Sequence, residues 1–156
     1  MAYVSLDSDQ IKKAHKKHKY TKEQVLQLEQ CMDHKTGPLY FMKTFMKIQH
    51  PTKGEMPFKP YAYQERLIEA YNDHRFSISM LPRQTGKTTC ASGYLIWYAM
   101  FVPDSQILIA AHKFTGAQDI MNRVRFVYEN LPDFLRAGAY SYNRNTLEFD
   151  NGSRIK

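Results

Sequence analysis

The most constraining feature of the sequence is the stretch Leu-Pro-Arg-Gln-Thr-Gly-Lys-Thr-Thr at residues 81–89. It follows a short apolar run at residues 76–81 and opens a long apolar run that ends near Val102. A strand, a tight loop and a helix, in this order, form the setting of a phosphate-binding P-loop. The pattern therefore predicts a nucleotide site between a strand and a helix.

The residue types in this stretch suit the phosphates and the metal ion of a bound nucleotide. Gly86 lets the backbone turn so that its N–H groups face phosphate oxygens. The N-terminus of the following helix adds unpaired N–H donors and a positive dipole end. Lys87 can reach the β- and γ-phosphates, and the Thr88 hydroxyl can ligate Mg²⁺.

One position departs from the general P-loop pattern. That pattern places a glycine five residues before Gly86, where this sequence has Leu81. The alternative interpretation is a turn that only caps the following helix. The apolar runs on both sides of the loop favour the phosphate site, although Arg83-Gln84 inside the loop is unusual.

A second candidate for nucleotide binding lies upstream, at Tyr63-Gln64, near the start of an expected helix. A carboxamide is both donor and acceptor, so Gln64 can pair with the N6 amine and N7 of adenine. An aromatic ring beside it can stack on the base. The alternative is a helix start that carries a surface glutamine.

The rest of the chain predicts helices and hairpins around this site. Thr21 and Gln24 form a capping box, and Asn151-Gly152 is a hairpin turn signal. Arg123 and Arg125 fall off the apolar face of their helix and are expected to be solvated. The expected elements are helices over 21–32, 39–48, from 61 and 115–131, hairpins over 48–59 and 146–156, and a buried parallel strand over 106–111.

The order β-α-β-α with the P-loop first predicts an α/β fold, a three-layer P-loop NTPase core with a mainly parallel sheet. We expect a basic flexible arm over residues 1–20, a helical segment with a β-hairpin over 21–60, and the front of the ATPase domain over 61–156. The core is expected to be incomplete, because no apolar strand ends in the acidic residue that anchors Mg²⁺ in such ATPases. Asp150 enters a turn and is a poor candidate.

The charge balance favours polyanionic partners. The chain has 22 Lys and Arg against 15 Asp and Glu, and neutralising phosphates releases condensed counterions. Residues 12–20 form a dense basic cluster, interpreted either as a solvated arm or as an arm that contacts phosphates.

Other compositional features exclude several classes. Cys31 and Cys90 give neither a disulfide framework nor a zinc spacing, and His15 and His18 have no further ligands nearby. No apolar run reaches the ~18 residues of a membrane span, and the first residues lack the layout of a signal peptide. A cytoplasmic setting is expected.

The sequence resembles the N-terminal part of the large terminase subunit of T4-like tailed bacteriophages, the ATPase that drives DNA into the procapsid. The similarity runs from about residue 21 to the end, in the order of that family. The motifs that carry it are Tyr63-Gln64, residues 83–89, residues 109–113, residues 129–135 and residues 147–153.

The resemblance implies a role for each residue of the site. Lys87 and Thr88 would bind phosphate and Mg²⁺, and Gln64 would read adenine. Arg83 would be the catalytic residue that stabilises charge on the transferring phosphoryl group. The ATP-binding set is Gln64, Arg83, Gln84, Thr85, Gly86, Lys87, Thr88 and Thr89.

The resemblance also implies partners and further parts. The partners would be double-stranded DNA, the portal protein, the small terminase subunit and other copies in a homo-oligomeric ring, in the cytoplasm of the infected bacterial host and with no membrane. The acidic pair of the ATPase and a C-terminal nuclease are not found in these 156 residues. The chain alone is therefore expected to be inactive.

Two alternatives remain at this level. A superfamily 2 helicase or translocase shares the upstream glutamine and the P-loop, although Arg83-Gln84 argues against it. A non-catalytic basic module for DNA binding or assembly could also carry a decayed ATP site.

Overall fold

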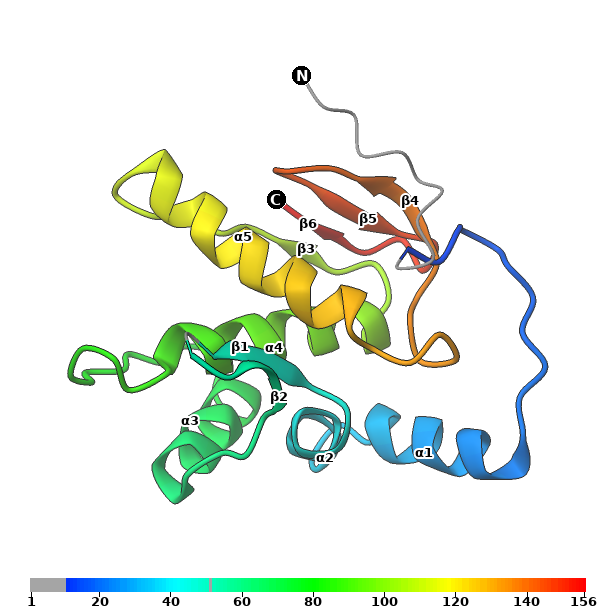
Figure 1. The fold of residues 1–156 in the computed structure, drawn as a ribbon, viewed down its shortest axis with the longest axis horizontal. Coiled ribbons are helices and arrows are strands. Elements are labelled where there is room, and N and C mark those ends of the chain that lie inside the picture. The colour runs from blue at the N-terminus through cyan, green and yellow to red at the C-terminus, as the bar shows by residue number, and fades with distance from the viewer. Residues whose placement is uncertain (1–10, 51) are drawn as a thin grey trace.

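Helix α4, Lys87–Phe101, lies at the centre of the fold in this computed structural model, which describes residues 11–50 and 52–156. It contacts α2, α3, α5 and β3, and with α5 it lies between a four-stranded sheet and the helices α1 to α3 (Figure 1). The other helices are α1 (Lys22–Met32), α2 (Gly37–Thr44), α3 (Ala62–Asp73) and α5 (Phe114–Glu129). The strands are β1 (Lys47–His50), β2 (Gly54–Pro57), β3 (Gln106–Ile107), β4 (Ala139–Tyr142), β5 (Leu147–Phe149) and β6 (Arg154–Ile155).

The composition of α4 explains its central position. The helix is apolar on nearly every side, and Cys90, Ile96 and Trp97 are buried in the core. The Trp97 indole donates a hydrogen bond of 2.8 Å to the carbonyl of Cys31 at the end of α1, so its polar atom is satisfied inside the core. A helix without a polar face needs neighbours all round, as found here.

Helix α1 begins as predicted, whereas both ends of α2 differ from the prediction. The capping box of α1 is confirmed, with Gln24 N donating to Thr21 Oγ1 and Thr21 N donating to Gln24 Oε1. The break expected at Gly37-Pro38 is instead the first turn of α2, where proline fits because those N–H groups lack helical partners. The helix expected to reach residue 48 ends at Thr44.

The predicted hairpin after α2 is confirmed, and it explains why α2 is short. Strand β1 pairs antiparallel with β2, with Ile48 opposite Met56 and His50 opposite Gly54. Residues 47–50 form backbone hydrogen bonds across this hairpin instead of continuing the helix. Gly54 has a φ of +71°, which suits the turn.

The four-stranded sheet differs from the expected core. Its order is β3-β6-β5-β4, and within it β3 and β6 run parallel while the other pairs run antiparallel. The protein is therefore a mixed α/β fold, and the three-layer, mainly parallel P-loop core is not confirmed. The strand expected over 106–111 is limited to its first two residues, and β4 was not predicted.

The apolar run before the loop is not a paired strand in the described part of the chain. Residues 77–82 have no assigned secondary structure, and the side chains of Phe76, Ile78 and Met80 are exposed, the last two at 96% and 93%. A strand forms only where a neighbour satisfies its backbone groups, and none of the described strands lies against this segment. The strand predicted before the loop is therefore not formed in the described chain.

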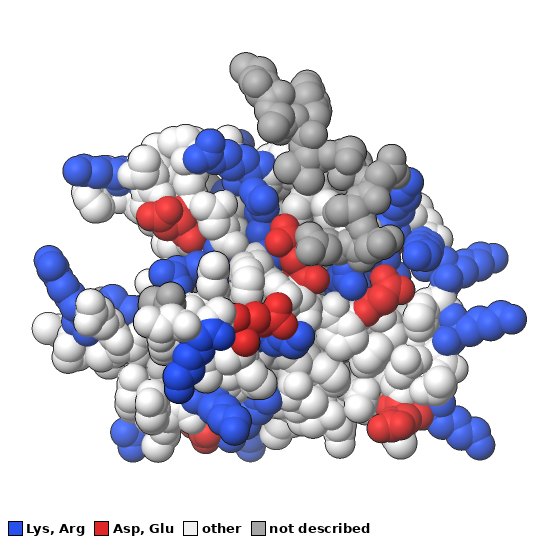
Figure 2. All heavy atoms as spheres, in the orientation of Figure 1, with Lys and Arg blue, Asp and Glu red and all other residues white. Residues whose placement is uncertain are grey.

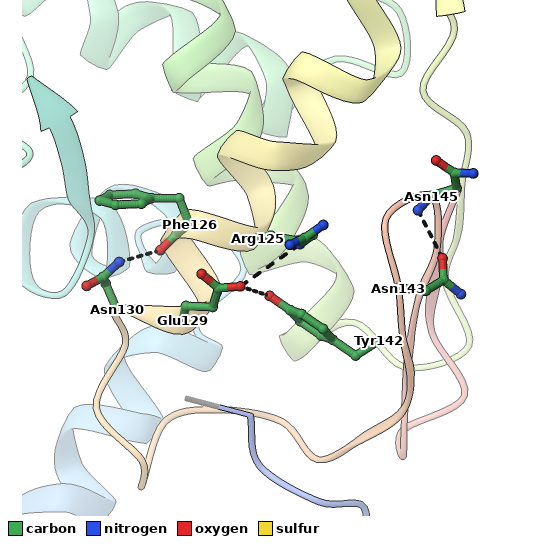
Figure 3. A network of polar contacts seen from close by, with 7 residues as sticks. All are labelled: Arg125, Phe126, Glu129, Asn130, Tyr142, Asn143 and Asn145. Carbon is green, nitrogen blue, oxygen red and sulfur yellow. Dashed lines mark hydrogen bonds and ion pairs between the residues drawn. The ribbon is translucent and has the colours of Figure 1, made fainter. Parts of the chain in front are cut away.

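Figure 3 shows how α5 is joined to β4. Arg125 was expected to be solvated, but its guanidinium lies 5.4 Å from the centre of the Tyr142 ring and its Nε lies 4.0 Å from Glu129 Oε1. The Tyr142 hydroxyl donates to Glu129, and burial, together with this bond, raises the pKa of Tyr142. The prediction for Arg125 was wrong, whereas Arg123 is exposed as expected.

The start of α5 also differs from the prediction, while its apolar face does not. The N-cap is Lys113 rather than Thr115. Met121, Val124 and Val127 are buried on the predicted face.

The C-terminal hairpin forms as predicted and closes one end of α4. Gly152 has a φ of +82° in its turn. The Asn151 side chain donates to the carbonyls of Ala99 at 2.9 Å and Met100 at 3.1 Å, and the Ser153 hydroxyl donates to the Val102 carbonyl at 2.9 Å. These bonds satisfy carbonyls that have no partner inside the helix.

Residues 11–15 of the expected basic arm lie against the sheet. Ile11 and Lys12 are buried, and the backbone of Lys13 forms a parallel bridge with Ala139 of β4. Burial lowers the pKa of Lys12, an effect that Asp133 and Asp150 oppose. Residues 1–10 of the expected arm lie outside the described residues. Among those described, no helix is long and apolar enough to cross a membrane.

Candidate functional site

The loop at residues 81–89 comprises the last part of the connection between α3 and α4 and the first three residues of α4. It lies at the left of Figure 1, away from the sheet. Gly86 is the N-cap of α4 and has a φ of +76°, a conformation that favours glycine. Gln84 also has a positive φ, of +64°. Leu81, which stands where the general pattern has its first glycine, does not have a positive φ. Its backbone conformation therefore does not require glycine.

Lys87 bends back over the loop that precedes it. Its Nζ lies 3.3 Å from the Leu81 carbonyl and 3.2 Å from the Pro82 carbonyl. The Thr85 hydroxyl donates to the same Pro82 carbonyl at 3.0 Å. The ammonium group thus donates to neutral carbonyl oxygens of the loop. A phosphate oxygen would compete with these carbonyls for the ammonium group, because it accepts a stronger, charge-assisted hydrogen bond.

Tyr63 and Gln64 contact the loop directly. The Tyr63 hydroxyl donates to the Thr85 carbonyl at 2.9 Å, and Gln64 Nε2 donates to the same oxygen at 3.0 Å. Gln64 Oε1 accepts from the Tyr61 N–H at 3.0 Å, and the Gln64 side chain is only 6% exposed. Gln64 therefore lies in the first turn of α3, as one interpretation proposed, but it is not a surface residue. Its contact with adenine stays a prediction.

The remaining predicted residues belong to the loop, and within the described chain they form no hydrogen bonds or ion pairs with one another. Arg83 and Gln84 are exposed, and within the described residues the Arg83 guanidinium has no hydrogen bond or ion pair. The Thr88 carbonyl accepts from Ser92 at 2.8 Å, while its hydroxyl has no partner in the described chain. The turn before α4 thus offers an exposed, free guanidinium at Arg83, and the first turn of α4 offers a free hydroxyl at Thr88.

Three acidic side chains of the C-terminal part, among them the poor candidate Asp150, form contacts away from the loop. Asp133 lies 3.7 Å from His18, Glu148 lies 3.0 Å from Arg154 Nε, and Asp150 accepts from the backbone N–H of His15 at 3.1 Å. Across residues 11–50 and 52–156 no group of three or more His, Cys, Asp and Glu could hold a metal ion. Thr88 therefore stays the expected contribution of this part of the chain to Mg²⁺ binding.

A cavity of about 560 Å³ lies between β1, α4 and α5. Thr89 and Ser92 line it, together with residues of β1 and α5 such as His50 and Asn122. None of residues 81–88 lines this cavity. Of the predicted site residues, Thr89 alone faces it.

Cys90, in the first turn of α4, takes no part in the site. Its side chain is fully buried, and burial raises the pKa of its thiol to about 11. A thiol with such a pKa stays protonated near neutral pH and is a poor nucleophile. Cys90 is therefore a small residue of the core.

The comparison with known families supports the sequence resemblance. Residues 78–156 match the family described as terminase large subunit, T4likevirus-type, N-terminal. The chain belongs to this family. The matched residues include the whole of the loop, whereas Tyr63 and Gln64 lie upstream of the match. The terminase resemblance is thereby confirmed, and a superfamily 2 helicase is set aside.

Sequence reasoning missed the partners that hold the site in place. Tyr63 was considered only for stacking on a base, yet its hydroxyl binds a backbone carbonyl of the loop. The contact joins residues 22 positions apart, and no local pattern encodes it. The one feature of the sequence that could have suggested this contact is that the aromatic residue before Gln64 carries a hydroxyl.

Proposed function

We propose that the loop at residues 81–89 binds the phosphates of ATP, and that this site is the nucleotide site of a DNA-packaging terminase. The observation that carries the proposal is the position of the Lys87 ammonium, 3.2–3.3 Å from two loop carbonyls, at the N-terminus of a central helix. Lysine in that position supplies the charge that the β- and γ-phosphates need. The helix N-terminus adds its own positive potential.

The carboxamide of Gln64 has the hydrogen-bonding capacity to read adenine. One of its N–H groups is used by the Thr85 carbonyl and one lone pair by the Tyr61 N–H. One donor and one acceptor remain, which are what the N7 and N6 positions of adenine require. Gln64 would therefore serve both the base and the loop.

Arg83, Gln84, Thr85, Thr88 and Thr89 complete the proposed site. The unpaired guanidinium of Arg83 would act on the phosphoryl group as negative charge develops in the transition state. The Thr88 hydroxyl would hold Mg²⁺, which supplies charge neutralisation when bound. The backbone of residues 84 and 85 would line the phosphates.

Membership of the terminase family supports the wider role. In the intact protein the site would power translocation of double-stranded DNA into a procapsid, within a homo-oligomeric ring that contacts the portal protein and the small terminase subunit. The work would take place in the cytoplasm of the infected bacterial host. Among the described residues on the face shown in Figure 2, basic side chains lie along the outline and over the lower part, with acidic ones between them, so these residues form no single basic patch there.

A binding measurement tests the proposal. Lys87→Ala should abolish binding of a fluorescent ATP analogue to the purified chain, because the ammonium is lost from the phosphate site. Lys53→Ala removes the same charge from the exposed hairpin and should leave binding unchanged. Equal affinity of the two variants would contradict the phosphate site and favour a non-catalytic module.

A further inference from the structure

Two side chains of α3 converge on a single backbone oxygen of the loop. The Tyr63 hydroxyl and Gln64 Nε2 donate to the Thr85 carbonyl at 2.9 and 3.0 Å. Thr85 precedes Gly86, the N-cap of α4. A carbonyl oxygen has two lone pairs, so these two donors fill its capacity.

Both donors are fixed before they reach the loop. The Tyr63 ring stacks on Tyr61, with ring centres 5.8 Å apart and planes 7° apart. The Gln64 carboxamide is anchored by the Tyr61 N–H and is nearly fully buried. A Cβ added to Gly86 would lie 2.6 Å from Gln64 Nε2, so the loop and the carboxamide are in close contact. The first turn of α3 is thus a rigid support for the loop.

The constrained carbonyl also sets the direction of an N–H group. The Thr85 carbonyl and the Gly86 N–H belong to one planar trans peptide unit, in which they point in opposite directions. Because the carbonyl is held toward Tyr63 and Gln64, the Gly86 N–H must face away from α3. In a P-loop, such backbone N–H groups are the ones that contact phosphate.

We propose that Tyr63 and Gln64 form a two-donor clamp that fixes the orientation of the Thr85–Gly86 peptide, and that Tyr63 is a positioning residue for phosphate binding. The second part rests on the proposed function. The clamp acts through the loop, so Tyr63 affects the phosphate end of a nucleotide and not its base. If Tyr63 instead stacked on adenine, it would affect binding of the base and not of the phosphates.

Variants of the clamp can be matched closely. Tyr63→Phe removes the donated hydrogen bond and keeps the ring stack. Tyr61→Phe removes a hydroxyl from the other ring of the stack and serves as the control. Gln64→Glu keeps an acceptor for the Tyr61 N–H but places an oxygen opposite the Thr85 carbonyl, so it should weaken the clamp more than Tyr63→Phe does.

The first measurement uses the nucleotide-free chain. The carbonyl ¹³C resonance of Thr85 responds to the hydrogen bonds that this oxygen accepts. This resonance should shift in Tyr63→Phe and in Gln64→Glu, and should not shift in Tyr61→Phe. The thermal unfolding temperature of Tyr63→Phe should be close to that of the unchanged protein. If the Thr85 carbonyl resonance does not shift in Tyr63→Phe, the clamp is overturned.

The second measurement compares ligands with and without phosphates. Tyr63→Phe should weaken ADP and ATP binding by about threefold to tenfold, the range expected for one lost hydrogen bond. It should leave adenosine affinity and the ADP-to-GDP affinity ratio unchanged. An equal loss for adenosine and ADP would overturn the positioning role. If the unchanged chain binds no nucleotide, the proposed function fails, and the Thr85 resonance still decides the clamp.

Discussion

The two ends of helix α4 are held in different ways. At the C-terminal end, Asn151 and Ser153 donate to three carbonyls of residues 99–102. At the N-terminal end, the Lys87 ammonium rests on loop carbonyls, and Arg83 and the Thr88 hydroxyl have no partners in the described chain. A protein interior normally satisfies its polar groups, so the C-terminal end is a completed structural junction. The N-terminal end has the free donors of a binding site.

The largest effect should come from the free guanidinium. In an active terminase that contains this chain, Arg83→Ala should lower kcat by about 10²- to 10³-fold and change KM little, because the contact matters in the transition state. Steady-state kinetics measure both constants. Arg123→Ala, an exposed arginine of α5, is the control and should change neither. A change confined to KM would assign Arg83 to ground-state binding.

A smaller effect is expected at the completed end. Asn151→Ala leaves the Ala99 and Met100 carbonyls without their donor, which should lower the free energy of unfolding by about 1–3 kcal/mol. Urea denaturation measures the change. Asn122→Ala, which removes an exposed side chain without a partner in the described chain, should cost far less. ATP affinity should be the same in both variants, and a loss of affinity in Asn151→Ala would show that the two ends are coupled.

The smallest effect concerns backbone strain in the loop. Gln84 has a φ of +64°, a conformation that costs a non-glycine residue about 1–2 kcal/mol. Gln84→Gly should therefore be more stable than Gln84→Ala, by about 1 kcal/mol after the greater freedom of glycine in the unfolded chain is counted. Thermal unfolding of the two variants measures this difference. Equal stability would mean that the positive φ is not retained in solution.

Local patterns predicted what depends on neighbours in sequence. The capping box at Thr21, the Asn151-Gly152 turn and the apolar face of α5 each depend on a few adjacent residues, and each is confirmed. The boundary between α2 and β1 could not be predicted, because it depends on pairing with residues 54–57. Residues 76–81 have the pattern of a strand, but strand formation also needs a partner, and none is found among the described strands.

The candidate site was predictable only in part. The motif at residues 81–89 identifies Gly86, Lys87 and Thr88 by residue type and order. The contacts that hold the loop join Tyr63 and Gln64 to Thr85, more than 20 positions away, and depend on how α3 packs beside α4. Similarly, nothing in the spacing of α5 indicated that Arg125 would lie on the ring of Tyr142.

One measurement tests the contrast between the two ends of α4 most directly. Titration of the ¹⁵N-labelled chain with ATP and Mg²⁺ should shift the backbone amide resonances of Gly86, Lys87 and Thr88 in a saturable manner. The resonances of Asn151 to Ser153 should stay in place, and Lys87→Ala should abolish the shifts. Saturable shifts elsewhere, with the amides of residues 86–88 unmoved, would contradict the assignment of this loop as the phosphate site.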